Sequence, residues 1–368
     1  MQLRELSFAE RRDWLRLTRT HTVGPVAFRD LLKRFGTAAK ALDALPGLIR
    51  KKDIRPPSLQ QVEAEMEASE RLGIRLLAAC EPDYPAPLRA IDPPPPLISI
   101  WGQSGLLSKP CVAIIGSRNA SANGQRFAGR IAGELAEEGF VVVSGLARGI
   151  DGCAHRAALD HGTIGVLGGG VDHIYPRQNE DLHLEMRERG LLVSESPLGY
   201  RATARDFPRR NRIISGLCRG VVVIEAAERS GTLITARYAA EQGREVMAAP
   251  GSPLDPRTKG CNRLIRQGAA LIESADDILE CLAGLPDTQF LEPEETYEDP
   301  PVSWQVAAKE IESAKTQILD VLSPTPSPRD DIIRASELPT SIVNAALLEL
   351  ELNAEIAVEA DGRISGLY

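Results

Sequence analysis

The 368-residue sequence lacks the patterns typical of a metal site, a disulfide framework or a membrane segment. Its six cysteines lie far apart with no Cys-x-x-Cys pair, so we predict neither a zinc site nor a set of disulfides. No stretch approaches the ~18 continuous apolar residues of a membrane span. Residues 1–17 carry charges throughout and have no apolar segment of the kind found in signal peptides. We therefore expect a soluble, cytoplasmic protein that does not bind membranes.

Signatures of enzymes are equally scarce. There is no G-x-x-x-x-G-K-[S/T] loop, and the first apolar run after residue 110 leads into Gly116-Ser117-Arg118 rather than G-x-G-x-x-G. The histidines have no metal-ligand spacing, and no Ser-His-Asp set can be assembled. Asp151 and Glu225, at predicted element ends, are possible acids or bases, with helix capping as the alternative for Asp151. The sequence thus predicts no metal, no cofactor and no catalytic centre.

The net charge argues at first against a nucleic-acid partner, since 51 acidic residues face 43 basic ones. The excess acid is confined to one region. Residues 286–368 carry 17 acidic and 5 basic side chains, whereas residues 109–285 carry 21 and 22. The charge therefore argues only against the C-terminal region as a carrier of nucleic-acid binding.

Two changes in composition divide the chain. The first is the run Asp92-Pro93-Pro94-Pro95-Pro96, and the second is an acidic, proline-bearing stretch that we interpret as a linker over residues 286–301. Before them, residues 1–80 are predicted to form a helical domain with a Val23-Gly24-Pro25 turn between two helices. That order fits a helix-hairpin-helix whose turn amides meet a DNA phosphate, or a plain helical packing domain.

Residues 81–285 alternate short apolar, β-branched runs with amphipathic stretches. The runs lie at residues 111–115, 140–143, 163–167, 191–193, 220–224 and 245–248. Strands that are nearly all apolar and separated by helices are typical of a parallel sheet covered on both faces. We predict an α/β fold with a doubly wound, Rossmann-like, mostly parallel sheet.

Residues 302–368 are predicted to form a winged helix. Three helical stretches, at 311–322, 330–335 and 340–351, precede two strands, 355–358 and 364–368, around an Ala360-Asp361-Gly362 turn. The recognition helix, residues 340–352, contains no Lys or Arg and would meet DNA phosphates with the wrong sign. We expect a protein-contact or autoregulatory role for it, and an unchanged or higher affinity for single strands when residues 286–368 are deleted.

Small residues gather at four strand or helix ends of the middle region. They are Gly116-Ser117-Arg118, Ser144-Gly145-Leu146-Ala147-Arg148-Gly149-Ile150-Asp151, Gly168-Gly169-Gly170 and Ser230-Gly231-Thr232. Ligands bind outside the carboxyl ends of parallel strands, so these segments predict a phosphate-binding rim. The alternative for each loop is tight strand-to-helix packing, and for Arg118 it is an ion pair with a surface carboxylate.

A block of arginines follows the predicted strand at residues 191–193: Arg201, Arg205, Arg209, Arg210 and Arg212, with Phe207 and Asn211 among them. Arginines of this kind can bind backbone phosphates while Phe207 stacks on an unpaired base. In the alternative interpretation Phe207 fills the core and the arginines form a solvated or ion-paired face.

Together these segments resemble the DNA-processing protein A (DprA/Smf) family. The resemblance rests on residues 114–118, 144–151, 207–217, 230–236 and 250–252, in the family's order. It implies a sterile-alpha-motif-like N-terminal domain, an extended Rossmann-like domain and a C-terminal winged helix. A lysine that the family often has before its Phe-Pro pair is replaced here by Ala204, and the neighbouring Arg205 is the candidate substitute.

The same resemblance implies a non-enzymatic protein that binds and protects single-stranded DNA and helps load RecA recombinase in natural transformation and recombination. It also implies a homodimer through the Rossmann-like domain. The implied nucleic-acid-binding residues are Gly116, Ser117, Arg118, Ser144, Gly145, Arg148, Gly149, Arg205, Phe207, Arg209, Arg210, Asn211, Arg212, Gly231 and Thr232.

One alternative from a different class is an enzyme. The middle region also resembles the lysine-decarboxylase-like nucleotide phosphoribohydrolases, which carry a Pro-Gly-Gly-x-Gly-Thr loop and a downstream Glu. In the corresponding place this chain has Glu225 to Thr232, without the glycines that precede the Gly-Thr pair. Release of a base from a nucleoside monophosphate distinguishes the two hypotheses.

Overall fold

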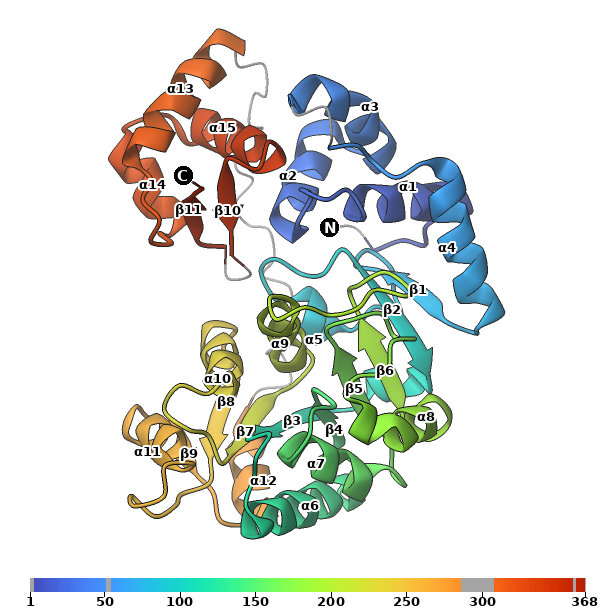
Figure 1. The fold of residues 1–368 in the computed structure, drawn as a ribbon, viewed down its shortest axis with the longest axis vertical. Helices are drawn as coiled ribbons and strands as arrows, with labels where there is room; N and C mark the ends of the chain where they lie inside the picture. Colours follow the sequence, from blue (N-terminus) through green and yellow to red (C-terminus); the bar gives the residue numbers. More distant parts are fainter. Residues whose placement is uncertain (1–2, 51–53, 286–307, 360–361, 368) are drawn as a thin grey trace.

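The computed structural model describes residues 3–50, 54–285, 308–359 and 362–367 (Figure 1). The predicted acidic linker, residues 286–301, lies outside the described residues, as does most of the predicted Ala360-Asp361-Gly362 turn. Within the described residues, no helix is both long and apolar enough to span a lipid bilayer.

Four helices form the N-terminal domain: α1 (Phe8–Thr18), α2 (Pro25–Phe35), α3 (Ala38–Leu48) and α4 (Leu59–Arg71). Local sequence sets where they begin. Ser7 and Ser58 start α1 and α4 as reciprocal capping boxes with Glu10 and Gln61. Pro25 occupies the first turn of α2, where its missing N–H costs nothing. The turn predicted at residues 23–25 therefore joins two helices, as expected.

Nine strands form the central sheet, in the order β1-β2-β6-β5-β4-β3-β7-β8-β9. Their bounds are β1 (Arg75–Ala78), β2 (Leu97–Gly102), β3 (Cys111–Gly116), β4 (Val141–Ser144), β5 (Thr163–Leu167), β6 (Leu191–Ser194), β7 (Gly220–Ile224), β8 (Glu245–Ala248) and β9 (Ala270–Leu271). From β6 to β9 all pairings are parallel, whereas β2 pairs antiparallel with both β1 and β6. The predicted Rossmann-like sheet is confirmed. It extends back to Arg75, within the range assigned to the helical domain.

Helices cover both faces of this sheet (Figure 1). One face carries α6 (Ala122–Glu137), α7 (Ile150–Ala158) and α12 (Ala275–Ala283). The other carries α5 (Ala86–Arg89), α9 (Asp206–Gly216), α10 (Thr232–Glu241) and α11 (Lys259–Arg266), while α8 (Glu180–Arg189) packs beside β2, β5 and β6. Two 3₁₀ turns, η1 (Ser104–Ser108) and η2 (Arg177–Asn179), complete the domain. Double burial explains why the parallel strands are almost entirely apolar in sequence.

The C-terminal region folds as the predicted winged helix. It contains α13 (Ala308–Val321), α14 (Arg329–Ser336), α15 (Thr340–Leu352), β10 (Ile356–Val358) and β11 (Ile364–Gly366). The last two pair antiparallel, and Ser327 forms an isolated bridge to Ile364. The winged helix lies beside the N-terminal helices, at the end of the molecule away from α6 and α12 (Figure 1).

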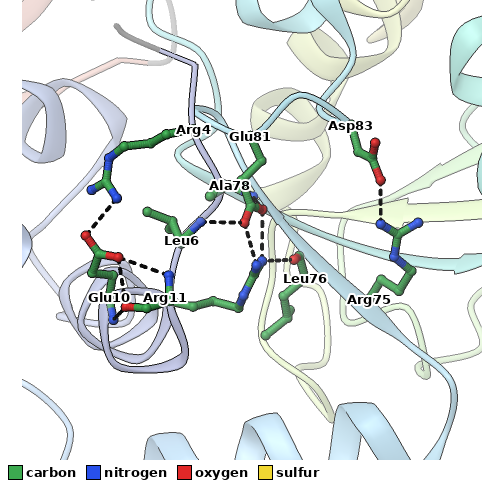
Figure 2. A network of polar contacts seen from close by, with 10 residues as sticks. Arg4, Leu6, Glu10, Arg11, Arg75, Leu76, Ala78, Glu81 and Asp83 are labelled. Atoms are coloured by element: carbon green, nitrogen blue, oxygen red, sulfur yellow. Dashed lines mark hydrogen bonds and ion pairs between the residues drawn. The ribbon is translucent and has the colours of Figure 1, made fainter.

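A buried ion pair joins the N-terminal domain to the sheet domain (Figure 2). Glu81, only 2% exposed, accepts hydrogen bonds from the backbone amides of Leu6 (3.2 Å) and Ala78 (2.8 Å). Arg11 of α1 pairs with the same carboxylate and also donates to the carbonyl of Leu76 in β1 (2.6 Å). The carboxylate is thus fully satisfied, and α1 is held against the sheet's first strand.

Candidate nucleic-acid interface

The sheet reverses its winding direction at β3. The chain runs outward from β3 through β4, β5 and β6, then returns to β7 on the other side of β3. Such a reversal opens a crevice at the carboxyl ends of the central strands, which is where open α/β sheets bind ligands. Here a cleft of about 650 Å³ is lined by Gly116, Arg118, Phe207, Asn211 and Thr232, among others. Ala147 and Asp151 of the loop after β4 line it as well, so four of the predicted segments meet at one site.

Two predicted glycines at this cleft are required by close packing. A Cβ on Gly116 would lie 1.9 Å from the carbonyl oxygen of Ile224, and one on Gly149 would lie 2.2 Å from that of Ser117. Gly149 also has φ +77°, a conformation that favours glycine. Packing thus accounts for these glycines, and it brings the loops after β3 and β4 into direct contact.

A buried pair of opposite charges fixes the loop after β4. Asp151 accepts hydrogen bonds from the backbone amides of Gly145 (3.1 Å) and Ala147 (3.3 Å). Arg210 of α9 donates to the carbonyls of Gly145 (2.8 Å) and Val166. Burial raises the pKa of Asp151, although Arg210 opposes this, and burial lowers the pKa of Arg210 to about 10. These two residues hold the floor of the cleft, and Asp151 behaves as a loop cap.

The outer wall of the cleft combines aromatic rings with exposed guanidinium groups. Arg118 lies over the Phe207 ring, 5.3 Å from its centroid, and the Tyr175 ring is 5.5 Å from Phe207 at a tilt of 35°. The Arg118 side chain is exposed at the cleft. Arg148, Arg205 and Arg209 are exposed as well, on the loop after β4 and on the segment that carries Phe207, but they are not among the residues that line the cleft. Arg118 has no ion-pair partner among the described residues, which disfavours the alternative of a surface ion pair. The wall therefore offers both positive charge and stacking surfaces.

Arg118 and Phe207 also separate the cleft from a smaller pocket. This pocket, of about 50 Å³, is lined on its far side by Gly145, Arg148 and Gly168. Tyr175 lines both cavities and is 50% exposed, yet the sequence reasoning missed it. The available signal was an aromatic residue shortly after Gly168-Gly169-Gly170, at the end of β5.

Two predicted binding residues face away from the cleft. The hydroxyl of Ser144 is fully buried and donates to the carbonyl of Ile114 (2.6 Å), so it cross-links neighbouring strands. Arg212, 3% exposed, binds both carboxylate oxygens of Glu195 at 2.8 Å and the carbonyl of Pro93 at 2.9 Å. For these two the structure corrects the prediction: neither side chain reaches the surface where a phosphate would lie.

Of the remaining predicted residues, Ser117, Asn211, Gly231 and Thr232 are at least partly accessible, whereas Gly145 is buried. Ser117 accepts from the amide of Asn119 (3.1 Å), and Thr232 donates to the carbonyl of Gly116 (3.1 Å), which ties the start of α10 to the end of β3. Gly231 is exposed, and Asn211 is half-buried beside Arg210. Gly145 is buried beneath the Arg210 guanidinium, where a Cβ would lie 2.5 Å from Nη2.

The start of α6, where a Rossmann-type nucleotide site would bind phosphate, is occupied by a side chain. Glu225, at φ +54°, accepts hydrogen bonds from the amide of Ser121 (2.8 Å) and from its hydroxyl. A Cβ on Gly124, in the first turn of α6, would lie 2.6 Å from the same carboxyl group. A carboxylate here excludes a nucleotide phosphate, which disfavours the phosphoribohydrolase alternative. Among the described residues no three His, Cys, Asp or Glu side chains cluster as metal ligands.

Comparison with known families agrees with this geometry. The family described as DNA recombination-mediator protein A matches residues 75–283. A DprA-like N-terminal HHH domain matches residues 8–68, and a DprA winged helix domain matches residues 304–362. The chain belongs to the DNA-processing protein A (DprA/Smf) family. The resemblance first drawn from the sequence is thereby confirmed.

Several relatives cover most of this family member. DNA processing protein DprA of Bacillus subtilis is 44% identical over 242 residues, which are 64% of this chain and 80% of the relative. Protein Smf of Escherichia coli is 39% identical over 312 residues, 83% and 81% of the two chains. Of the solved structures, DprA from Streptococcus pneumoniae superimposes with a TM-score of 0.62 at 33% identity, covering 76% of this chain and 98% of that one.

A second solved structure, DNA processing protein A from Helicobacter pylori, is described for its single-stranded DNA binding mode. It superimposes with a TM-score of 0.53 at 29% identity and covers 57% of this chain and 95% of that one.

Proposed function

We propose that this DprA/Smf family member binds single-stranded DNA in the cleft at the carboxyl ends of β3, β4 and β7. The observation that carries the proposal is the exposed Arg118 guanidinium stacked on Phe207. Phosphates of the strand bind Arg118, Arg148, Arg205 and Arg209, while unpaired bases stack against Phe207 and Tyr175. The single-stranded DNA binding described for the Helicobacter pylori relative supports the same assignment.

The protein acts by binding, without chemistry on its ligand. Asp151, which lines the cleft, and Glu225, at the start of α6, are engaged by backbone amides and a hydroxyl, which leaves neither in the role of general base. By protecting a single strand and assisting the loading of RecA recombinase, such a protein serves natural transformation and recombination in the cytoplasm. Its family's description as a recombination mediator supports this role.

The protein forms a homodimer through the sheet domain. Strand β9 ends the sheet, and its Leu271 is 49% exposed. Leu254, on the loop that precedes the neighbouring α11, is 92% exposed. An open strand edge flanked by exposed leucines is the type of surface that a second copy covers.

The test of the DNA site compares Arg118→Ala with Arg130→Ala, a control on the outer part of α6. Fluorescence anisotropy with a labelled oligonucleotide is measured over a series of salt concentrations. Arg118→Ala should weaken binding and reduce the slope of log K against log salt by about one unit, because one phosphate contact is lost. Arg130→Ala should leave both quantities unchanged. Equal binding by Arg118→Ala and the unchanged protein would contradict the assignment.

A further inference from the structure

Helix α15 is apolar on both of its sides, which is unusual for the recognition helix of a winged helix. Val343, Leu347 and Leu350 pack into the core of the winged helix itself. Leu348 and Leu352, 1% and 0% exposed, belong instead to the core of the N-terminal domain, together with residues of α1, α2 and α3. Helix α15 therefore buries apolar side chains on two faces, one in each core. The face that would meet DNA is thus covered by protein.

A buried asparagine completes this contact. Asn353, 1% exposed, follows the last turn of α15. Its side-chain oxygen accepts from the amide of Arg50 (2.7 Å), and its side-chain nitrogen donates to the carbonyl of Leu48 (3.0 Å), at the end of α3. The asparagine therefore satisfies backbone groups that the end of α3 leaves open. Polar complementarity of this kind indicates a specific docked arrangement.

Charged side chains also pair across the contact. Arg34 of α2 lies 3.9 Å from Glu349 of α15, and Arg329, at the start of α14, lies 3.2 Å from Asp30 of α2. Glu349 is held from its own domain by Lys315 of α13. Glu349, one of the two acidic residues of α15, thus has a cationic partner on each side of the contact.

We propose that α15 is the docking face of the winged helix for the N-terminal domain of the same chain, and that this intramolecular contact opens as the pH rises. In the closed state α15 cannot enter a DNA groove, and the turn at Gly24 between α1 and α2 is covered as well. The single-stranded DNA cleft lies on the sheet domain and does not take part.

The alkaline opening follows from the surroundings of Glu351. Its carboxyl group lies next to Gly24, where a Cβ would be 3.4 Å from Oε1, and it faces Asp30 of α2 and Arg329 of α14. Asp30 is shared between Arg329 and Arg29. Burial, reinforced by the Asp30 charge and partly offset by Arg329, raises the pKa of Glu351 to about 8.

The raised pKa of Glu351 determines how the docking equilibrium changes with pH. The closed contact binds the Glu351 proton more tightly than an open, solvated glutamate does. Closing is therefore most favourable at acidic pH and becomes less favourable as pH rises from about 4.5 to about 8, by up to about tenfold per pH unit. Above that range both states are ionised and the dependence ends.

The experiment uses the full chain with a specific protease site placed within residues 286–307. After cleavage, size-exclusion chromatography at about pH 6 and about pH 9 shows whether the winged helix still co-elutes with the rest. We expect co-elution at the lower pH and separation at the higher one. The variant Glu351→Gln should co-elute at both, and Glu359→Gln, an exposed glutamate after β10, should behave like the unchanged chain.

Hydrogen–deuterium exchange on the uncut chain provides the second readout. After correction for intrinsic rates, protection at residues 24–27 and 349–353 should fall at alkaline pH and persist in Glu351→Gln. Separation at the lower pH would overturn the docking. Co-elution of the unchanged chain at both values, or a Glu351→Gln variant that separates as readily, would overturn the pH-dependent opening.

Discussion

Phe207 lies between the guanidinium of Arg118 and the aromatic ring of Tyr175. Its ring is half-buried between Tyr175 and the Arg118 guanidinium, and it forms part of the wall shared by the cleft and the smaller pocket. Because a ring has no sequence preference in stacking, a base of any kind can pack on it. The arginine above the ring supplies the charge that attracts the adjacent phosphate.

Replacing this ring should separate stacking from charge. We expect Phe207→Ala to weaken binding of a single-stranded oligonucleotide by about 1–3 kcal/mol, because a stacked base loses its partner. The salt dependence should remain that of the unchanged protein, since no phosphate contact is removed. Anisotropy titrations at several salt concentrations measure both, and Phe127→Ala on α6 serves as the control. A reduced salt slope in Phe207→Ala would show that the ring acts by positioning Arg118.

A second residue of interest, His155, is buried in the sheet domain near Arg210 of the cleft. It is fully buried, with Nδ1 2.8 Å from the hydroxyl of Thr163. Burial, helped by the nearby Arg210 charge, lowers the pKa of His155 to about 3. The folded state therefore binds this proton more weakly than the unfolded chain, so stability is complete above about pH 6.5 and declines as pH falls toward 3.

Urea unfolding at two pH values tests this dependence. Between about pH 6.5 and pH 5, His155 should contribute about 2 kcal/mol to the fall in unfolding free energy. His155→Gln should be less stable at neutral pH and lose less stability on acidification. Some dependence should remain, because burial also lowers the pKa of His183, to about 4. The exposed His161→Gln should follow the unchanged protein, and an identical slope in His155→Gln would contradict the assignment.

At the scale of elements, a buried ion pair joins α1 to the turn after β1, and an exposed pair lies close to it (Figure 2). Arg11 and Glu81 form the buried pair, whereas Arg75 and Asp83, 51% and 60% exposed, form the exposed one. The burial of each pair determines how much its loss destabilises the folded chain. Loss of one partner leaves an uncompensated charge only where water cannot reach it.

The two pairs provide a matched comparison. Arg11→Met should destabilise the chain by about 3 kcal/mol, because Glu81 remains buried with its charge unpaired. Arg75→Ala should cost less than about 1 kcal/mol, since both groups of that pair are hydrated. Denaturant unfolding of the two variants measures the difference. Similar losses in both would show that Arg11 contributes little beyond its backbone hydrogen bond to Leu76.

The elements that the sequence predicted well are those whose burial leaves a plain pattern. The parallel strands from β3 to β8 are continuous apolar runs because helices cover both their faces. The short edge strand β1 offered no such run. The start of α9 at Asp206 has no plain pattern either, because Pro208 and the polar residues beside it are typical of a loop as well as of a helix start.

The candidate site was predictable in its location but not in every side chain. Glycine and arginine at strand ends sufficed to place the cleft. Arg210 and Arg212 are two residues apart on α9, so at about 100° per residue they point to nearly opposite sides, and only Arg210 lines the cleft. Since the sequence does not show where α9 begins, the opposite orientation of these two arginines could not be deduced from it.

For the whole molecule, the distribution of charge and apolar surface assigns different roles to different regions. The arginines that face the cleft belong to the sheet domain, whereas the acidic winged helix is docked on the N-terminal helices (Figure 1). The exposed leucines 254 and 271 lie on the part of the sheet domain that carries β9 and α11. The surfaces proposed for DNA binding and for self-association are therefore separate from each other and from the surface on which the winged helix docks.

The association surface can be tested with a pair of leucine variants. Leu271→Arg should convert a dimer to a monomer, because a charge placed on β9 opposes burial of that edge. Leu184→Arg, an equally exposed position on α8, should leave the mass unchanged. Sedimentation velocity measures both. A dimeric Leu271→Arg variant would move the predicted interface to another part of the sheet domain.

The contribution of α15 to two cores has a consequence for synthesis of the chain. The N-terminal helices are made well before Leu348 and Leu352, which complete their core. About 300 residues separate α3 from Leu348, so at roughly 5–20 residues per second the ribosome needs on the order of 15–60 s to supply them. During that interval the apolar side of α2 and α3 has no native cover. Nascent-chain chaperones that bind exposed apolar surface should therefore engage the first domain for longer than its length alone would suggest.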